Sequence, residues 1–104
     1  MVSEVTASNW TFLTNHAQVL LCIADDPGIR LREIGERVGI TERAAHRIVV
    51  ELEQSGYVSR RREGRRNRYT ISPRRRLPDP VVRGRRVGDL LGLVAGTPSG
   101  ESSR

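Results

Sequence analysis

The sequence has no lysine, one cysteine and only four aromatic residues among its 104. With so few aromatics and 37% apolar residues, the core must be modest and built from Val, Ile and Leu. The lone Cys22 cannot form an internal disulfide, which excludes a disulfide scaffold and favours a reduced, cytoplasmic compartment. The length fits one small domain with a short extension and excludes a large catalytic domain.

Long hydrophobic runs and catalytic constellations are missing too. No apolar run approaches the roughly 20 residues that span a bilayer, and no basic region followed by an apolar stretch opens the chain, so we expect neither a membrane segment nor a signal peptide. His16, Cys22 and His46 lie far apart, and no nucleophile, paired-carboxylate or phosphate-loop pattern accompanies them. We therefore predict no enzyme activity, no metal site and no cofactor.

Positive charge is abundant and segregated. All 18 basic residues are arginines, and the net charge is +6. Residues 57–86 contain 12 arginines and 2 acidic residues, a net charge of +10, whereas residues 1–56 carry a net charge of −3. Such a block predicts a polyanionic partner, with nucleic acid first and an anionic membrane second.

Apolar spacing predicts three helices. Thr14 or Asn15 caps a helix over 15–25 that ends at the Asp-Asp-Pro-Gly run. A second helix covers 31–38, Gly39 permits a tight turn, and Thr41 caps a third helix that reaches about Ser55, with Gly56 as C-cap. Two helices joined by a short Gly-containing turn are typical of a helix-turn-helix. The expected core residues on these helices are Val19, Leu20, Cys22, Ile23, Leu31, Ile34, Val38, Ala45, Ile48, Val49 and Leu52.

After Gly56 the apolar period changes from 3.6 to 2, which predicts a strand over 57–62, a turn over 63–67 and a return strand over 68–71. Val58, Tyr69 and Ile71 face the core, and Asn67 is interpreted as a turn residue with positive φ rather than a base reader. The fold class is therefore α+β, mainly helical: a winged helix-turn-helix of three helices, a two-stranded β-wing and a C-terminal helix.

The ends of the chain are read from composition. We expect a flexible N-terminus over 1–9, a DNA-binding domain over 10–72, a basic Pro-rich linker over 73–79, a C-terminal helix over 80–95 and a disordered tail over 96–104. Asp79 caps the last helix and Pro80 occupies its first position, followed by an apolar stripe at Val87, Leu90, Leu91 and Val94. Trp10 and Phe12 are expected to pack in the core or in a dimer interface.

The stretch from Leu31 to Val58, LREIGERVGITERAAHRIVVELEQSGYV, resembles the helix-turn-helix core of MarR/ArsR-type winged-helix transcriptional regulators. Residues 64–69, GRRNRY, resemble their wing, and with residues 10–16 the whole is similar to short actinobacterial regulators of this kind. The resemblance covers 10–72 well and 77–94 loosely. The long dimerisation helices of full-length MarR proteins, and the clustered Cys and His ligands of metal-sensing ArsR proteins, have no counterpart.

In this fold the second helix of the pair enters the major groove. Arg43 and Arg47 share one face, and each can form a bidentate contact with guanine. Glu42 either accepts from cytosine or complements the helix dipole, and His46 is either a DNA contact or a solvated residue. The expected DNA-binding residues come from both helices of the pair and from the wing: Arg32, Thr41, Glu42, Arg43, Ala44, His46, Arg47, Arg60, Arg62, Arg65, Arg66, Asn67 and Arg68.

A two-residue period prevents the wing arginines, which include Arg61, from all facing one way, so about half should meet phosphates or a narrow minor groove. The alternative for them is a solvated positive face. Residues 74–76 either follow the DNA backbone beyond the wing or only solubilise the chain. We predict a sequence-specific regulator that binds double-stranded DNA as a homodimer. A protein-interaction winged helix and a non-specific nucleic-acid-binding protein are its rivals, and the sequence names no effector.

Overall fold

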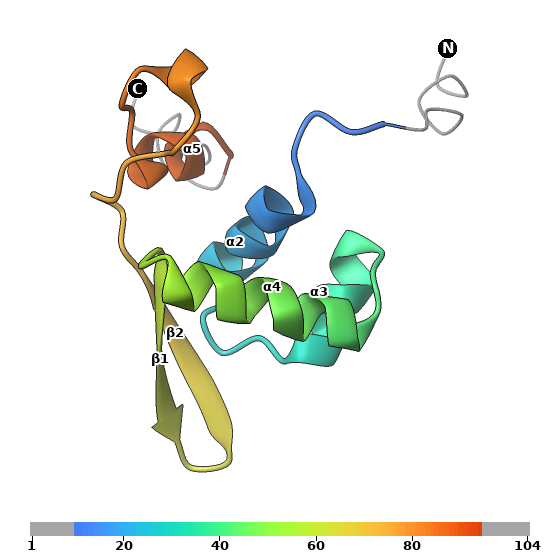
Figure 1. The fold of residues 1–104 in the computed structure, drawn as a ribbon. Helices are drawn as coiled ribbons and strands as arrows, with labels where there is room; N and C mark the ends of the chain where they lie inside the picture. Colours follow the sequence, from blue (N-terminus) through green and yellow to red (C-terminus); the bar gives the residue numbers. More distant parts are fainter. Residues whose placement is uncertain (1–9, 95–104) are drawn as a thin grey trace, which may run out of the picture.

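A computed structural model describes residues 10–94 of the chain (Figure 1). Its elements follow one another as three helices, a hairpin, a short 3-10 helix and a last helix: α2 (Asn15–Asp25), α3 (Leu31–Val38), α4 (Glu42–Gln54), β1 (Val58–Glu63), β2 (Arg66–Ile71), η1 (Pro80–Val82) and α5 (Val87–Val94). This order confirms the predicted winged helix-turn-helix. The tails predicted over 1–9 and 96–104 lie outside the described residues.

The three helices of the domain bury their predicted apolar faces against one another. The four core positions expected on α2 and the four expected on α4 are all buried, and Ile34 of α3 is fully buried between them. Leu31 and Val38 are half-buried at the edge of this core. Burial of a Val, Leu or Ile side chain contributes about 1.5–3 kcal/mol, so these faces dominate the stability of the domain.

Threonines cap α2 and α4: Thr41 as predicted, and Thr14 as one of the two alternatives, Thr14 and Asn15, that the sequence left open. The Thr14 hydroxyl oxygen accepts a hydrogen bond from the Ala17 N–H (3.1 Å), and Thr41 does the same for Ala44 (3.0 Å). Each bond satisfies one of the amide groups left free at a helix N-terminus. At the far end of α4 the C-cap is Ser55, and Gly56 follows it with φ +83°. The predicted C-cap at Gly56 is therefore one residue too late.

The turn between α3 and α4 depends on two glycines for different reasons. Gly39 adopts φ +88°, a left-handed conformation that residues with a Cβ rarely take, as predicted. At Gly35 the constraint is space, because an added Cβ would lie 2.7 Å from the Ile40 carbonyl oxygen. The same stretch closes tightly, since the Gly39 and Ile40 N–H groups both donate to the Gly35 carbonyl.

The wing, residues 58–71, is an antiparallel hairpin with a register that runs from Val58 opposite Ile71 to Glu63 opposite Arg66. Its turn is only Gly64 and Arg65, with Gly64 at φ +63°. The predicted five-residue turn was wrong, because ladder pairing continues to the end of both strands. Asn67 consequently lies within β2 and not in the turn, and the only described non-glycine residue with positive φ is Arg83.

The wing docks on the helices through backbone and side chains. Val58 and Tyr69 are buried in the core, and the Tyr69 N–H donates to the Pro27 carbonyl (2.9 Å) in the loop between α2 and α3. Arg60 forms an ion pair with Glu53 of α4 (3.2 Å). Since a two-stranded hairpin is marginal by itself, these contacts give the wing its fixed direction away from α4 (Figure 1).

The C-terminal segment differs from its prediction. The expected continuous helix over 80–95 is broken, because η1 ends at Val82, Arg83 and Gly84 follow it with positive φ, and α5 begins only at Val87. The Asp79 side chain makes no capping hydrogen bond. Residues 73–88 fold back on themselves, since the Leu77 N–H donates to Arg85 (2.8 Å) and the Val87 N–H donates to Arg75 (2.9 Å).

Trp10 and Phe12 are not part of the core. Their side chains are 63% and 91% exposed, and their rings contact each other edge to face with centroids 4.8 Å apart. The core alternative for these two residues is therefore wrong. Packing in a dimer interface is the alternative that stays open.

Candidate nucleic-acid interface

The N-terminal half of α4 presents a cationic face. Arg43 and Arg47 lie one helical turn apart and are exposed, with His46 exposed between them. Neither arginine pairs with a carboxylate among the described residues. Thr41 and Ala44 have structural roles, because the Thr41 hydroxyl accepts from the Ala44 N–H and Ala44 is half-buried. The exposed side chains here that have no partner among the described residues are therefore two guanidinium groups, one imidazole and the Glu42 carboxylate.

A groove of about 410 Å³ separates the wing from the N-terminal ends of α3 and α4. Its floor includes Ile29 and Tyr69, and Glu42 is its only carboxylate among the described residues. Its polar lining is otherwise dominated by guanidinium groups: Arg30, Arg32, Arg65 and Arg66, together with Asn67. All four arginines are exposed and lack a carboxylate partner in the described part of the chain. A groove with this lining attracts a negatively charged ligand.

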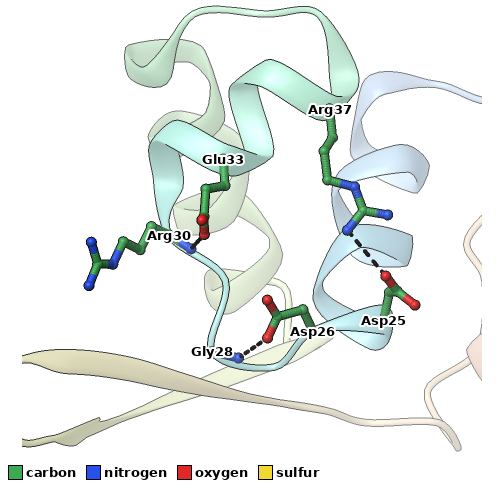
Figure 2. Close-up of polar contacts among 6 residues, drawn as sticks. All are labelled: Asp25, Asp26, Gly28, Arg30, Glu33 and Arg37. Atoms are coloured by element: carbon green, nitrogen blue, oxygen red, sulfur yellow. Dashed lines mark hydrogen bonds and ion pairs between the residues drawn. The ribbon is translucent and has the colours of Figure 1, made fainter.

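The loop between α2 and α3 fixes one wall of this groove (Figure 2). Asp26 Oδ1 accepts from the Gly28 N–H (3.2 Å), and the Arg30 N–H donates to Glu33 Oε1 (3.0 Å) at the start of α3. Figure 2 shows the Arg30 guanidinium pointing away from the helices. The backbone of Arg30 is thus held by the helix cap while its charge remains free to meet a ligand.

The ladder register divides the wing arginines into groups. Arg60 lies opposite Tyr69 and Arg62 opposite Asn67, so both point to the helix-facing side, where Arg60 is held by Glu53. The Arg62 Nε–H donates to the Gly64 carbonyl (3.2 Å).

Arg61 and Arg68 face the opposite side, and Arg61 pairs with Glu63 (2.8 Å). The wing arginines that have no partner within residues 10–94 are therefore Arg65, Arg66 and Arg68.

The structure brings together most of the residues that the sequence singled out. Arg32, Glu42, Arg65, Arg66 and Asn67 line the groove, and the exposed face of α4 continues directly from Glu42. Arg60 and Arg62 are tied to protein partners, and Arg68 lies on the outer face of the wing.

Arg30 is the residue that the sequence analysis missed. Its position just before the predicted helix at 31 was the only available signal, because its proximity to the wing depends on the tertiary fold.

A second hollow, of about 720 Å³, lies on another part of the molecule. It is mainly apolar and is formed by the segment before α2, the C-terminal end of α4 and the C-terminal segment, with Phe12, Leu52 and Val82 among its walls. At its edge His16 Nε2 and Glu51 Oε1 lie 2.6 Å apart and join α2 to α4. Its apolar walls make it unsuited to a polyanion and suited to an apolar partner surface.

Other kinds of site find little support in residues 10–94. No group of three His, Cys, Asp or Glu side chains in this range is arranged to hold a metal ion. Burial raises the pKa of the Cys22 thiol, as does Asp25 to a smaller extent, while Arg37 opposes the shift. A buried thiol with a raised pKa is a poor nucleophile. No helix of this range has the length and apolar character needed to cross a bilayer.

Comparisons with known proteins agree with this geometry. A search of curated proteins finds no match. Among solved structures, the PcaV transcriptional regulator from Streptomyces coelicolor is 26% identical, with a TM-score of 0.52 over 80% of this chain. The Mycobacterium tuberculosis MarR family protein Rv2887, solved in complex with salicylic acid, is 25% identical, with a TM-score of 0.50 over 70% of this chain.

The chain spans 57% and 53% of the lengths of these two proteins. SSV1 F-93 is 22% identical, with a TM-score of 0.51 over 62% of this chain and 77% of its own, and supports the fold alone. The model of the MarR family matches residues 11–68, more than half of the sequence and the whole of the helix-turn-helix. The chain therefore belongs to the MarR family of winged helix-turn-helix transcriptional regulators.

Proposed function

We propose that this protein is a cytoplasmic transcriptional regulator that binds double-stranded DNA in a sequence-specific manner, with α4 in the major groove. One observation carries the proposal: guanidinium groups that have no carboxylate partner in the described part of the chain run from the exposed face of α4 into the groove beside the wing. Family membership supports the same conclusion. The neighbouring guanidinium groups repel one another, and phosphate groups attract them. A polyanion is therefore the ligand that this surface favours.

Base reading is assigned to α4. Arg43 and Arg47 project from the N-terminal half of the helix, which is the half that reaches base edges in helix-turn-helix complexes. Each can donate two hydrogen bonds to O6 and N7 of guanine, which discriminates against the wrong base by about 1–3 kcal/mol. Glu42 lies in the first turn of the same helix and lines the groove, where it complements the helix dipole or accepts from cytosine.

Backbone contacts are assigned to the groove and the tip of the wing. Arg30 and Arg32 on one wall, and Arg65 and Arg66 on the other, can bracket a phosphate strand that passes between α3 and the wing. Phosphate contacts of this kind position a protein on the duplex without reading sequence. Arg60 and Arg62 serve the wing itself through Glu53 and Gly64.

We further propose that the regulator is a homodimer that uses α2, the Trp10 and Phe12 segment and residues 80–94. Trp10, Phe12 and Val81 are 63%, 91% and 85% exposed, and Phe12 also lines the apolar hollow between these parts. A partner copy would remove this apolar surface from water. Two half-sites about one helical turn apart would then form an inverted repeat.

Selection of bound duplexes from a random library at near-physiological salt tests sequence reading, because phosphate contacts alone give tight binding at low salt. We expect enrichment of an inverted repeat. Arg43→Ala and Arg47→Ala should each lower affinity for the selected duplex by about 1–3 kcal/mol while changing non-specific affinity much less. Glu36→Ala, an exposed change on α3 away from the groove lining, is the control.

The rivals predict other outcomes. Binding without enrichment would favour a non-specific nucleic-acid-binding protein, and an absence of binding would favour a winged helix that contacts an acidic protein. Sedimentation at micromolar concentration tests the dimer, with Phe12→Ser as the variant that should shift it to monomer. A wild-type monomer under these conditions would overturn the dimer proposal.

A further inference from the structure

A second cationic surface lies outside the proposed DNA face. The arginine loop, residues 74–86, contains six arginines and a single acidic residue, Asp79. All six arginines are exposed, and none forms an ion pair with a carboxylate among the described residues. They occupy two short runs: Arg74, Arg75 and Arg76 before η1, and Arg83, Arg85 and Arg86 after it.

The arginine loop is a folded structure and not a loose basic tail. An isolated bridge pairs Arg76 with Arg86, and the Arg86 Nε–H donates to the Arg74 carbonyl (3.1 Å). The Tyr57 hydroxyl donates to the Arg76 carbonyl (2.9 Å), and the Arg75 guanidinium lies 5.5 Å from the centroid of the Tyr57 ring. These contacts hold like charges close together, and the repulsion this creates is relieved when an anion binds.

The position of the loop separates it from the first duplex. The loop packs against Gly56 and Tyr57, where α4 ends and the wing begins. Arg43 lies 13 residues before Gly56, about 20 Å along the helix, and the wing tip lies six strand residues away, also about 20 Å. Figure 1 shows α4 and the wing diverging from this corner, with the arginine loop on its outer side. A straight duplex held between α4 and the wing tip therefore does not reach the loop.

We propose that the arginine loop is a second nucleic-acid-binding surface, which contacts the phosphates of a duplex segment other than the one held by α4 and the wing. This inference rests on the proposed placement of the first duplex. It also requires that residues 80–94 face a partner copy through apolar side chains such as Val81 and leave their arginines in solvent. A duplex fits the loop better than an acidic peptide does, because its phosphates follow one another at about 1.7 Å along the axis and several guanidinium groups can bind at once. The protein would thereby hold two DNA segments together.

The test uses two charge-matched variants of the full chain. Arg74→Gln, Arg76→Gln and Arg85→Gln are combined in a loop variant, which leaves the Arg75 contact with Tyr57 and the Arg86 contact with Arg74 intact. Three substitutions, Arg65→Gln, Arg66→Gln and Arg68→Gln, are combined in a wing variant. Each protein is loaded on an immobilised duplex at near-physiological salt, and capture of a second, fluorescent duplex is measured.

We expect the wild type to capture the second duplex and the loop variant to capture about tenfold less, because lost phosphate contacts lower affinity steeply at this salt. The loop variant should keep its affinity for the first duplex, whereas the wing variant should lose it. If the loop variant captures the second duplex as well as the wild type does, the inference is wrong. The two duplexes would then be held by the two α4 and wing surfaces of a dimer, and not by the arginine loop. Equal loss of first-duplex affinity in both variants would also overturn it.

A second experiment separates the loop proposal from the proposed function of α4 and the wing. The tagged protein is attached to a solid support, and the binding of a duplex or of polyglutamate to it is measured. If the wild type binds a duplex that is lost in the loop variant and kept in the wing variant, the loop surface is real even though the proposed role of the wing fails. If the wild type binds polyglutamate but no duplex, and the loop variant binds neither, the loop is a surface for an acidic protein and the inference is wrong. A circular dichroism spectrum equal to that of the wild type shows that each variant is folded.

Discussion

The helix-turn-helix, α3 and α4, and the C-terminal segment, residues 73–94, belong to one short chain but are held by different forces. In the helix-turn-helix, caps and apolar spacing lie within a few residues of one another, and α4 alone buries four apolar side chains. In the C-terminal segment the only buried apolar side chain is Val87, and backbone bonds between its two halves define its shape. Local signals therefore specify the first region, and contacts between distant residues specify the second.

Core substitutions should give the largest contrast between the two regions. We expect Ile48→Ala to lower the free energy of unfolding by about 2–5 kcal/mol, because it leaves a cavity among fully buried neighbours. Val87→Ala should lower it by about 1–3 kcal/mol. Urea denaturation followed by circular dichroism measures both losses. If Ile48→Ala is already unfolded without urea, Ile48→Val replaces it, with an expected loss of about 1 kcal/mol in the free energy of unfolding.

Hydrogen exchange makes the same contrast local. Val87→Ala should speed exchange of the Leu77, Val87 and Gly88 amides, whose hydrogen bonds stay within the C-terminal segment, and leave the amides of α4 unchanged. Uniform acceleration over the whole chain would show that the two regions unfold as one unit, contrary to the comparison.

The glycines of the helix-turn-helix should give the next effect. Gly35→Ala should lower the free energy of unfolding by about 1–3 kcal/mol, because the new Cβ meets the Ile40 carbonyl backbone. Gly39→Ala should cost about 1–2 kcal/mol for its left-handed conformation alone. Asparagine distinguishes the two causes in thermal unfolding. Asparagine tolerates this conformation at Gly39, whereas at Gly35 it should be at least as harmful as alanine.

Helix caps offer a matched pair across the two regions. Thr41→Ala removes a side-chain hydrogen bond to the Ala44 N–H and should cost about 1 kcal/mol. Asp79→Ala removes no capping bond from η1, so its effect should stay within about 0.5 kcal/mol. Chemical denaturation of both variants checks this. An equal loss in both would mean that Asp79 supports the fold in a way that its contacts do not reveal.

Alkaline pH should lower the stability of the helix and wing region, where the two groups with a raised pKa lie. Burial raises the pKa of the Cys22 thiol and of the Tyr69 hydroxyl, so the folded state favours their protonated forms. Their contribution to stability is complete below their ordinary values, about 8.5 and about 10, and is lost as pH rises through the higher folded values. Denaturation at a series of pH values should show this decline in the free energy of unfolding. Cys22→Ala should remove the part of the decline at lower pH, and Tyr69→Phe should remove the part at higher pH.

The sequence predicted the helical framework well because its signals are local. Thr41, and either Thr14 or Asn15, are predicted as caps from their positions before apolar periodic runs, and Gly39 is predicted as the turn residue. The candidate interface was predicted in part. The exposed face of α4 follows from helical spacing, but the division of the wing arginines needs the strand register, and a turn set at 63–67 misplaced Asn67.

By itself the sequence determined a small winged helix-turn-helix with its charge concentrated after residue 56, because apolar period, caps and composition act over a few residues. Tertiary structure alone decided the rest. It placed Arg30 across a groove from Arg65 and Arg66, and left Trp10 and Phe12 outside the core. It also broke the expected last helix at Arg83, since pairing of Leu77 with Arg85 and of Val87 with Arg75 joins residues that no local pattern links.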